Sequence, residues 1–297
     1  MNNSTSQSDL KRRFVFDNAD VRGCYARLDE SCKTIQSTHY YPNSLARLIN
    51  EFTVAAVLLK DSIKSDGSLT VQMRTDGDLN LLIADCANDG SVRAICEYDH
   101  SGVLSDEIIL NHLPGAVLAV TITPEDGDRY QSIIPVEQSS LALCLEDYFD
   151  RSEQLPSRFH LLATADKAVG FSLHALPAQH IKDHVLSEQR FEHLNVLLKS
   201  MTLEEAHADT SADALTKLYH DESCRLFDAK PLQFGCECST ERSLNALRAL
   251  GEEELEVLVA EHKADNKDAV IVDCHFCFQR YPISFDQIDT LFSELLQ

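Results

Sequence analysis

Four cysteines in the last quarter of the chain have the spacing of a metal site. Cys236 and Cys238 form a C-x-C pair within "FGCECSTER", and Cys274 and Cys277 form a C-x-x-C pair within "DCHFCFQRY". Zinc in structural sites takes four such ligands in a tetrahedron, and closely spaced pairs bring two sulfurs to one ion. The sequence therefore predicts one Zn²⁺ held by the thiolates of Cys236, Cys238, Cys274 and Cys277.

The same four thiols can also carry redox chemistry. Neighbouring thiolates are open to oxidation, and each of the two pairs can close a disulfide. A disulfide across one intervening residue is strained, so a bond between Cys236 and Cys238 is expected to be easily reduced. Three interpretations stay open on these residues alone: a switch between metal and disulfides, a thiol oxidoreductase, and a structural zinc module that binds one folded partner.

Six further cysteines are scattered through the chain: Cys24, Cys32, Cys86, Cys96, Cys144 and Cys224. We expect them to be small buried or incidental side chains, which is how free cysteine usually behaves. Cys24 and Cys32, which polar residues flank, are the candidates for accessory thiols. The sequence assigns no role to any of the six.

The net charge argues against several partners. Asp and Glu number 48 against 26 Lys and Arg, which gives a net charge of -22. Such a charge repels nucleic-acid backbones and anionic membrane surfaces, so neither is expected as a partner. The N-terminus is polar and lacks the apolar segment of a signal peptide. These features predict a cytoplasmic protein, in which cysteines remain thiols or metal ligands.

Motifs of common enzyme classes do not occur. We find no G-x-x-x-x-G-K-[ST], no G-x-G-x-x-G and no G-x-S-x-G. His180 and His184 have the spacing of a metalloprotease helix, but the glutamate that would act as base is missing. We interpret them as two polar residues on a helix and predict that the chain is not an enzyme.

Periodicity predicts an α+β fold, with a mixed α/β sheet domain over residues 1–177. The stretch "NSLARLINEFTVAAVLLKDSI" has helical spacing of apolar residues. Several strand-like runs follow, among them "SLTVQMR" and "LNLLIADC", and Asp-Gly turn signals separate them. Consecutive strands joined by tight turns form hairpins, which indicate a largely antiparallel sheet.

Strand signals stop after that domain. For residues 178–233 the sequence predicts short helices with narrow apolar faces. Such helices must pack against another part of the protein, because short isolated helices are only marginally stable in water. Thr202 and Ser211 are expected to cap two of them. We predict that residues 234–297 form a small zinc-binding domain. So short a segment buries little apolar surface, and a bound metal would supply the missing stability. Ser284 and Gln287 are placed there as a capping box.

Motifs spread along the chain carry a family resemblance. They are "CEC" followed by Ser239 and Arg242, "CHFC", and Tyr281 with the helix after it. Further blocks are "TVQMRTDGDLNLLI", "VTITPEDGDRYQSIIPVE" and "ALCLEDYFDRSEQLPSRF". Together they cover nearly the whole chain, which resembles the heat shock protein 33 family of redox-regulated holdase chaperones.

The resemblance implies a mechanism. The reduced, zinc-bound monomer would be inactive, with a metastable linker between the two domains. Peroxide with heat, or hypochlorite, would form Cys236–Cys238 and Cys274–Cys277 disulfides and release zinc. The linker would then unfold, homodimers would form, and unfolding client proteins would be held without ATP.

Two residues beside the second cysteine pair depart from the pattern expected of the family. Phe278 stands where a small, glycine-like residue would tolerate a tight knuckle. His275, next to a ligand, could modulate the metal site. These departures concern the geometry of the site and its redox threshold.

Overall fold

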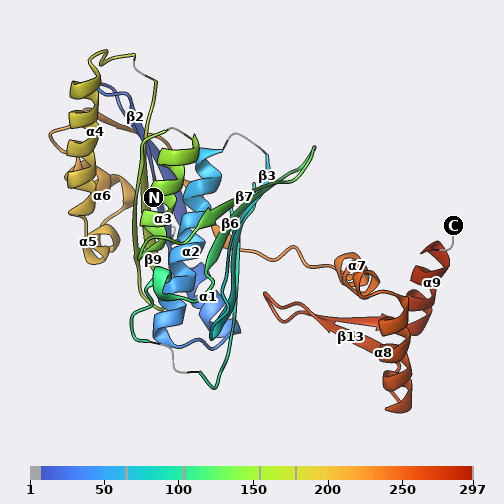
Figure 1. Cartoon of the computed structure of the whole chain (residues 1–297). Coiled ribbons are helices and arrows are strands. Elements are labelled where there is room, and N and C mark those ends of the chain that lie inside the picture. The colour runs from blue at the N-terminus through green and yellow to red at the C-terminus, as the bar shows by residue number, and fades with distance from the viewer. Residues whose placement is uncertain (1–7, 64–65, 103–104, 154, 178, 296–297) are drawn as a thin grey trace, which may run out of the picture. The chain divides into compact units, whose positions relative to one another are not determined.

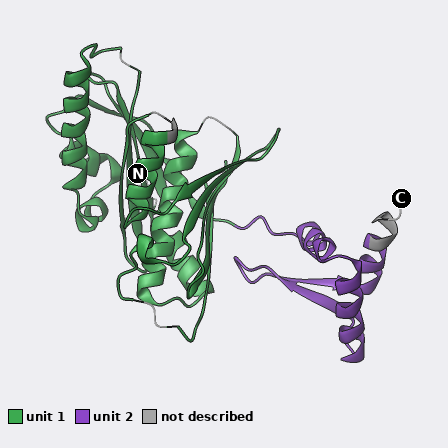
Figure 2. Ribbon diagram, viewed as in Figure 1, with its two compact units in different colours: residues 1–235 green, residues 236–297 purple. Residues whose placement is uncertain are grey.

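The computed structural model describes residues 8–63, 66–102, 105–153, 155–177 and 179–295. The chain divides into two compact units, Met1–Gly235 and Cys236–Gln297 (Figure 2). The boundary falls directly before the first cysteine of the C-x-C pair. Residues 178–233 group with the first unit, and the three-part division made from the sequence remains a prediction.

Unit 1 contains two sheets, and the first is wholly antiparallel. Its strand order is β10-β1-β2-β9-β8, with β11 also paired to β1. The strands are β1 (Leu10–Phe16), β2 (Val21–Leu28), β8 (Ser157–Ala163), β9 (Ala168–Ala175), β10 (Cys224–Leu226) and β11 (Lys230–Pro231).

The second sheet of unit 1 has the order β12-β5-β4-β3-β6-β7. It consists of β3 (Gly67–Arg74), β4 (Leu79–Cys86), β5 (Ser91–Tyr98), β6 (Val117–Pro124), β7 (Tyr130–Pro135) and β12 (Gln233–Phe234). All neighbours are antiparallel except β12, which runs parallel to β5. The prediction of an α+β fold built on hairpins is confirmed.

One helix, α2 (Asn43–Ser62), contacts strands of both sheets. Most of its residues are buried, as expected for a helix that is apolar on nearly every side. Four shorter helical segments accompany it: α1 (Glu30–Thr38), the 3-10 turn Leu110–His112, α3 (Leu141–Tyr148) and the π-helical turn Phe149–Glu153. Helix α2 therefore forms the centre of unit 1.

The predicted linker helices cover the other face of the first sheet (Figure 1). They are α4 (His184–Lys199), α5 (Leu203–Ala208) and α6 (Ser211–Leu218). Thr202 caps α5 in a capping box with Glu205, as expected. The cap of α6 is Thr210, one residue before the predicted Ser211, because it is the Thr210 hydroxyl that accepts the Asp213 amide.

This second face has its own apolar core. Phe191, Leu194 and Leu198 of α4 are buried against side chains of the sheet, including Phe14 and Phe171. The expectation of an exclusively helical linker is wrong at its end, where three strands, β10 to β12, join the sheets. Each is only two or three residues long, too short for any periodic signal.

The backbone at the end of unit 1, directly after β12, is packed closely against β5. The amide of Gly235 donates to the carbonyl of Val92 at 3.0 Å. A Cβ on Gly235 would lie 2.6 Å from the Cβ and Oγ of Ser91. No side chain fits there without displacing the strand.

Unit 2 is small. It contains α7 (Thr240–Leu250), α8 (Glu252–Ala264), the hairpin β13 (Ala269–Asp273) with β14 (Arg280–Ser284), and α9 (Phe285–Leu295). The buried apolar side chains of its described residues are Leu247, Leu255, Val259, Val270, Ile283, Ile288 and Leu291. The capping box is confirmed, since Ser284 and Gln287 exchange hydrogen bonds. Among the described residues of both units, no helix is long and apolar enough to cross a bilayer.

Candidate metal centre

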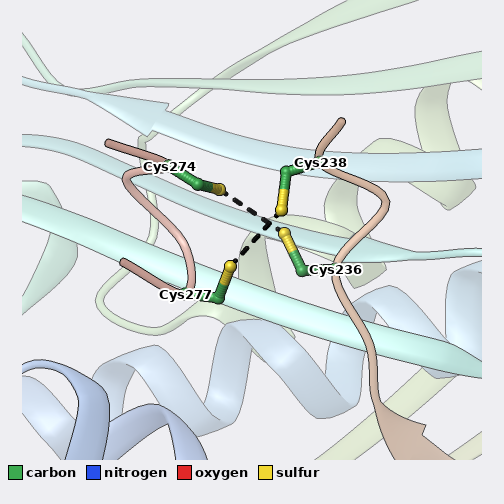
Figure 3. A group of neighbouring side chains, drawn as sticks. All are labelled: Cys236, Cys238, Cys274 and Cys277. Atoms are coloured by element: carbon green, nitrogen blue, oxygen red, sulfur yellow. Dashed lines mark hydrogen bonds between the residues drawn. The ribbon is translucent and has the colours of Figure 1, made fainter. Parts of the chain in front are cut away.

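The four cysteines of the two motifs meet in unit 2. Cys236 and Cys238 lie on the extended segment before α7, and Cys274 and Cys277 lie in the turn that joins β13 to β14. Their side chains point toward a common centre (Figure 3). All four sulfurs lie within 4.8 Å of one another.

The sulfur positions fit a tetrahedral ion. Cys236 Sγ is 3.5 Å from Cys274 Sγ, and Cys238 Sγ is 3.4 Å from Cys277 Sγ. A tetrahedron with metal–sulfur bonds of about 2.3 Å has edges of about 3.8 Å. The cluster therefore needs only small adjustments to hold one metal ion.

The turn that carries the second pair is tightly bonded. The Cys274 amide donates to the carbonyl of Gln279 at 2.9 Å, and the Phe278 amide donates to the carbonyl of Cys274 at 2.8 Å. Phe278 has a φ of 55°, in the left-handed region that favours glycine. This explains why phenylalanine is unexpected there, and its side chain is accommodated because it is 53% exposed.

A hydroxyl group supports the cluster from outside. The Tyr281 hydroxyl, on β14, donates to Cys238 Sγ at 3.0 Å. Ser239 accepts the Arg242 amide and so begins α7 directly after the first pair. The sequence marked Tyr281 as a motif residue without a role, because the contact joins residues 43 positions apart.

The protonation of the four thiols is uneven. Burial disfavours ionisation of Cys238, yet the hydrogen bonds from Tyr281 and the other thiols together lower its pKa below the ordinary value. Burial and the neighbouring thiols raise the pKa of Cys277 to about 12. A bound cation would displace the remaining protons, as in thiolate metal sites generally.

The other cysteines lie outside this cluster. Burial raises the pKa of all six, and Cys24 and Cys32 are only 3% and 0% exposed. Thiols of this kind are unreactive, because the thiolate is the nucleophile. The expectation of buried side chains is confirmed for five, and Cys224 is partly exposed on β10.

The two histidines noted in the sequence do not converge. His180 Nδ1 lies 2.7 Å from Asp20 Oδ1, and His184 Nδ1 lies 3.7 Å from Glu188 Oε2. Within the described ranges, the four cysteines are the one group of three or more candidate ligands close enough to share an ion.

The fold and the four-thiol cluster together define an α+β protein with a C-terminal candidate metal centre. The family model described as "Hsp33 protein" matches residues 9–284, and the chain belongs to that family. The chain is 40% identical over 286 residues to the 33 kDa chaperonin of Ectopseudomonas mendocina, with 96% of both sequences covered. It is also 40% identical over 288 residues to the 33 kDa chaperonin of Azotobacter vinelandii, with 97% of this chain and 96% of the relative covered.

A solved structure shares the fold. The crystal structure of the Hsp33 homolog of Thermotoga maritima superposes with a TM-score of 0.78, covering 98% of this chain and 99% of that one at 19% identity. The protein is thus a chaperone of the Hsp33 family, and the family confirms the prediction that it is not an enzyme.

Proposed function

We propose that the chain is a redox-regulated, ATP-independent holdase that binds unfolding proteins during oxidative stress. In the reduced, inactive monomer, Cys236, Cys238, Cys274 and Cys277 hold one Zn²⁺. The observation that carries this proposal is the convergence of four thiols within 4.8 Å in a chain of the chaperonin family. Clients would be met in the cytoplasm.

The proposed activation is a two-electron oxidation at each pair. Two thiolates give up two electrons to hydrogen peroxide, one S–S bond forms, the O–O bond breaks, and two hydroxide ions leave. The pairs are Cys236–Cys238 and Cys274–Cys277, and Zn²⁺ departs as its ligands are consumed. Cys236 Sγ lies 3.5 Å from Cys274 Sγ and Cys238 Sγ lies 3.4 Å from Cys277 Sγ, so the sulfurs are near one another but must still move closer before any S–S bond forms.

Loss of the ion would unfold unit 2. Its described core has only seven buried apolar side chains, and a structural zinc contributes on the order of 10 kcal/mol to such small domains. The strands β10 to β12 connect the linker helices to Cys236 along the chain. We propose that unfolding spreads through them and frees α4, α5 and α6.

The freed surface is suited to clients. Phe14, Phe16, Tyr25 and Phe171 lie under the linker and are 0% or 1% exposed. Release of the linker would present these aromatic side chains as one apolar patch, the kind of surface that binds other proteins. Dimers of the oxidised chain would enlarge it.

The test follows zinc, thiols and client aggregation in one sample. Peroxide at raised temperature should release one zinc per chain, consume four thiols and stop light scattering by a denaturing client at stoichiometric amounts. Oxidised, zinc-free protein that leaves aggregation unchanged contradicts the holdase. Zinc retained through oxidation would favour a structural module, and catalytic turnover of a disulfide substrate would favour an oxidoreductase.

A further inference from the structure

A cavity of about 300 Å³ lies in unit 1, between the first sheet and the C-terminal end of α2. Residues of β1, β2, β9 and β10 line it on the side of the sheet. Arg22 on β2 is paired with His174 on β9, and Cys24 is paired with Ser172. Because alternate residues of a strand point to the same face, these four side chains share the face of the sheet that α2 covers.

Three side chains of this wall carry buried polar atoms that lack hydrogen-bond partners. Among the described residues, none supplies a partner to Arg22 Nε, Ser172 Oγ or His174 Nε2. Ser172 is 0% exposed and His174 is 2% exposed. A buried polar atom without a partner is costly and rare in folded proteins. Three of them on one cavity wall indicate that a ligand supplies the missing hydrogen bonds.

The hydrogen bonds of His174 determine what its second ring nitrogen can do. The Ser157 hydroxyl donates its one proton to the carbonyl of Leu155 at 2.9 Å. His174 Nδ1 lies 2.8 Å from Ser157 Oγ, so Nδ1 carries the proton of that contact. Burial and the charge of Arg22 lower the pKa of His174 to about 4, so the ring is neutral at pH 7. Nε2 is therefore an acceptor that needs a donor.

The other charged groups of the wall have partners within the protein. Arg13 Nε lies 2.7 Å from Asp61 Oδ2, and Arg225 Nη2 lies 2.9 Å from Asp17 Oδ1. Arg22 donates from Nη2 to a carbonyl at the end of α2, at 3.2 Å. The cavity thus offers a ligand two donors, Arg22 Nε and the Ser172 hydroxyl, and one acceptor, His174 Nε2.

Much of the remaining wall is apolar. It includes Val15, Leu58, Leu176 and Phe227. Leu176 and Phe227 are 37% and 45% exposed, so the cavity opens to solvent between apolar side chains. A volume of 300 Å³ has room for about ten water molecules at roughly 30 Å³ each, far more than three polar atoms can hold. Water alone is therefore a poor occupant.

We propose that this cavity binds a small uncharged molecule in which a carboxamide is joined to a compact apolar group. The carboxamide oxygen accepts from Arg22 Nε and Ser172 Oγ, and its N–H donates to His174 Nε2. The apolar group lies against Leu58 and Phe227. A carboxylate leaves His174 Nε2 without a partner, because it has no proton to donate. The volume is at the lower end of the range for ligand pockets, so the ligand is small.

The test compares two probes of the same shape, benzamide and benzoate. Each is titrated at neutral pH into the reduced, zinc-loaded full chain, and binding is followed by NMR of the histidine side-chain nitrogens. Benzamide should bind at least about threefold more tightly than benzoate. Benzoate that binds as tightly or more tightly would show an anion site and overturn the assigned ligand class. Failure of benzamide to bind at about 10 mM would leave water as the occupant and overturn the site.

The His174 ring reports the contact directly, and its signals are assigned by their loss in His174→Asn. In the free protein Nδ1 should be protonated and Nε2 unprotonated. The Nε2 resonance should shift as benzamide binds, while the exposed His184 stays unchanged. A protonated Nε2 in the free protein, or a resonance that does not move at saturation, contradicts the proposal.

Two variants remove one contact each. Ser172→Ala should weaken benzamide binding about fivefold, the loss of one hydrogen bond. Arg22→Met, at a partly exposed side chain of similar length, should weaken it by a similar factor. The control is Ser101→Ala, at an exposed serine outside the cavity, which should bind as the wild type does. Wild-type affinity in either Ser172→Ala or Arg22→Met overturns the proposed contacts.

Discussion

The hydroxyl of Tyr25 on β2 donates to the carbonyl of Ala206 in α5 at 3.1 Å, across 181 positions of the chain. Both residues are fully buried, and the Tyr25 ring packs edge-on against Phe171 at 5.1 Å. Burial raises the pKa of Tyr25 to about 12, so the hydroxyl remains a donor. This buried hydrogen bond thus joins the centre of the first sheet to helix α5 of the linker.

Removal of that hydroxyl should loosen the linker. We expect Tyr25→Phe to destabilise the docked linker by about 1 kcal/mol, because the Ala206 carbonyl loses its partner while the ring stays packed. Amide exchange in α5 should accelerate several-fold in the reduced protein. Tyr40→Phe, at a side chain 90% exposed, is the control and should change nothing. Unchanged exchange in α5 would mean that this bond does not hold the linker.

Each of the four cluster cysteines should be needed for the metal. Cys274→Ser is expected to lower bound zinc from about one ion per chain to nearly none, since serine is a poor ligand for zinc. Far-UV circular dichroism should then lose the helices of unit 2 while unit 1 keeps its cooperative unfolding. Cys224→Ser on β10 is the matched control and should keep the ion. Full zinc content in Cys274→Ser would refute the four-ligand site.

The Tyr281 contact should tune the site. Tyr281→Phe removes the hydrogen bond to Cys238 Sγ, and the loss of such an outer partner weakens metal affinity about 10- to 100-fold. Chelator competition measures this affinity directly. Tyr130→Phe, at an exposed side chain of unit 1, serves as control. An affinity equal to that of the wild type would show that Tyr281 only packs against the cluster.

Phe278→Gly should stabilise the knuckle. A left-handed residue other than glycine costs about 1–2 kcal/mol, so glycine at this φ of 55° should raise the unfolding free energy of zinc-loaded unit 2 by about 1 kcal/mol. Ile271→Gly in β13, at a similarly exposed side chain, should destabilise instead, because glycine weakens strands. Thermal unfolding followed in unit 2 distinguishes the two. Destabilisation by both would mean that the Phe278 side chain makes favourable contacts.

Unit 1 should lose stability in mild acid through His174. Burial and the nearby Arg22 lower the pKa of His174 to about 4, while the unfolded chain binds a proton near pH 6.5. Because the unfolded state takes up more protons in that window, unfolding free energy falls as pH drops from 6.5 toward 4. His174→Asn should flatten this part of the urea-unfolding pH profile. His184→Asn, at an exposed histidine, should keep the slope.

Local patterns explain what could be predicted from sequence. Each pair of thiols lies within one short sequence motif. The spacing of the cysteines was therefore enough to predict that the four would meet at one site. The hairpins carry Asp-Gly turns, and α2 is long enough for its period to be clear. Gly251 ends α7 with a φ of 88°, a conformation that glycine adopts without strain.

Contacts between distant segments were not predictable in this way. The pairing of Leu10 with Pro231 leaves no trace in either stretch of sequence, because two-residue strands have no period. The role of Tyr281 likewise depends on a residue, Cys238, that only folding brings to its side. Thin apolar faces indicated that the linker helices needed a partner, but not which face of the sheet would supply it.

The close approach of Gly235 to Ser91 sets a boundary on variation in the sequence. Any side chain at position 235 must push β12 away from β5, and the next residue is Cys236, a proposed metal ligand. Glu237 is exposed and lies between two such ligands. In a survey of all single substitutions, we expect intolerance at 235, 236 and 238 and wide tolerance at 237. Three of these four consecutive residues would thus be constrained for two unrelated reasons, steric at 235 and chemical at 236 and 238.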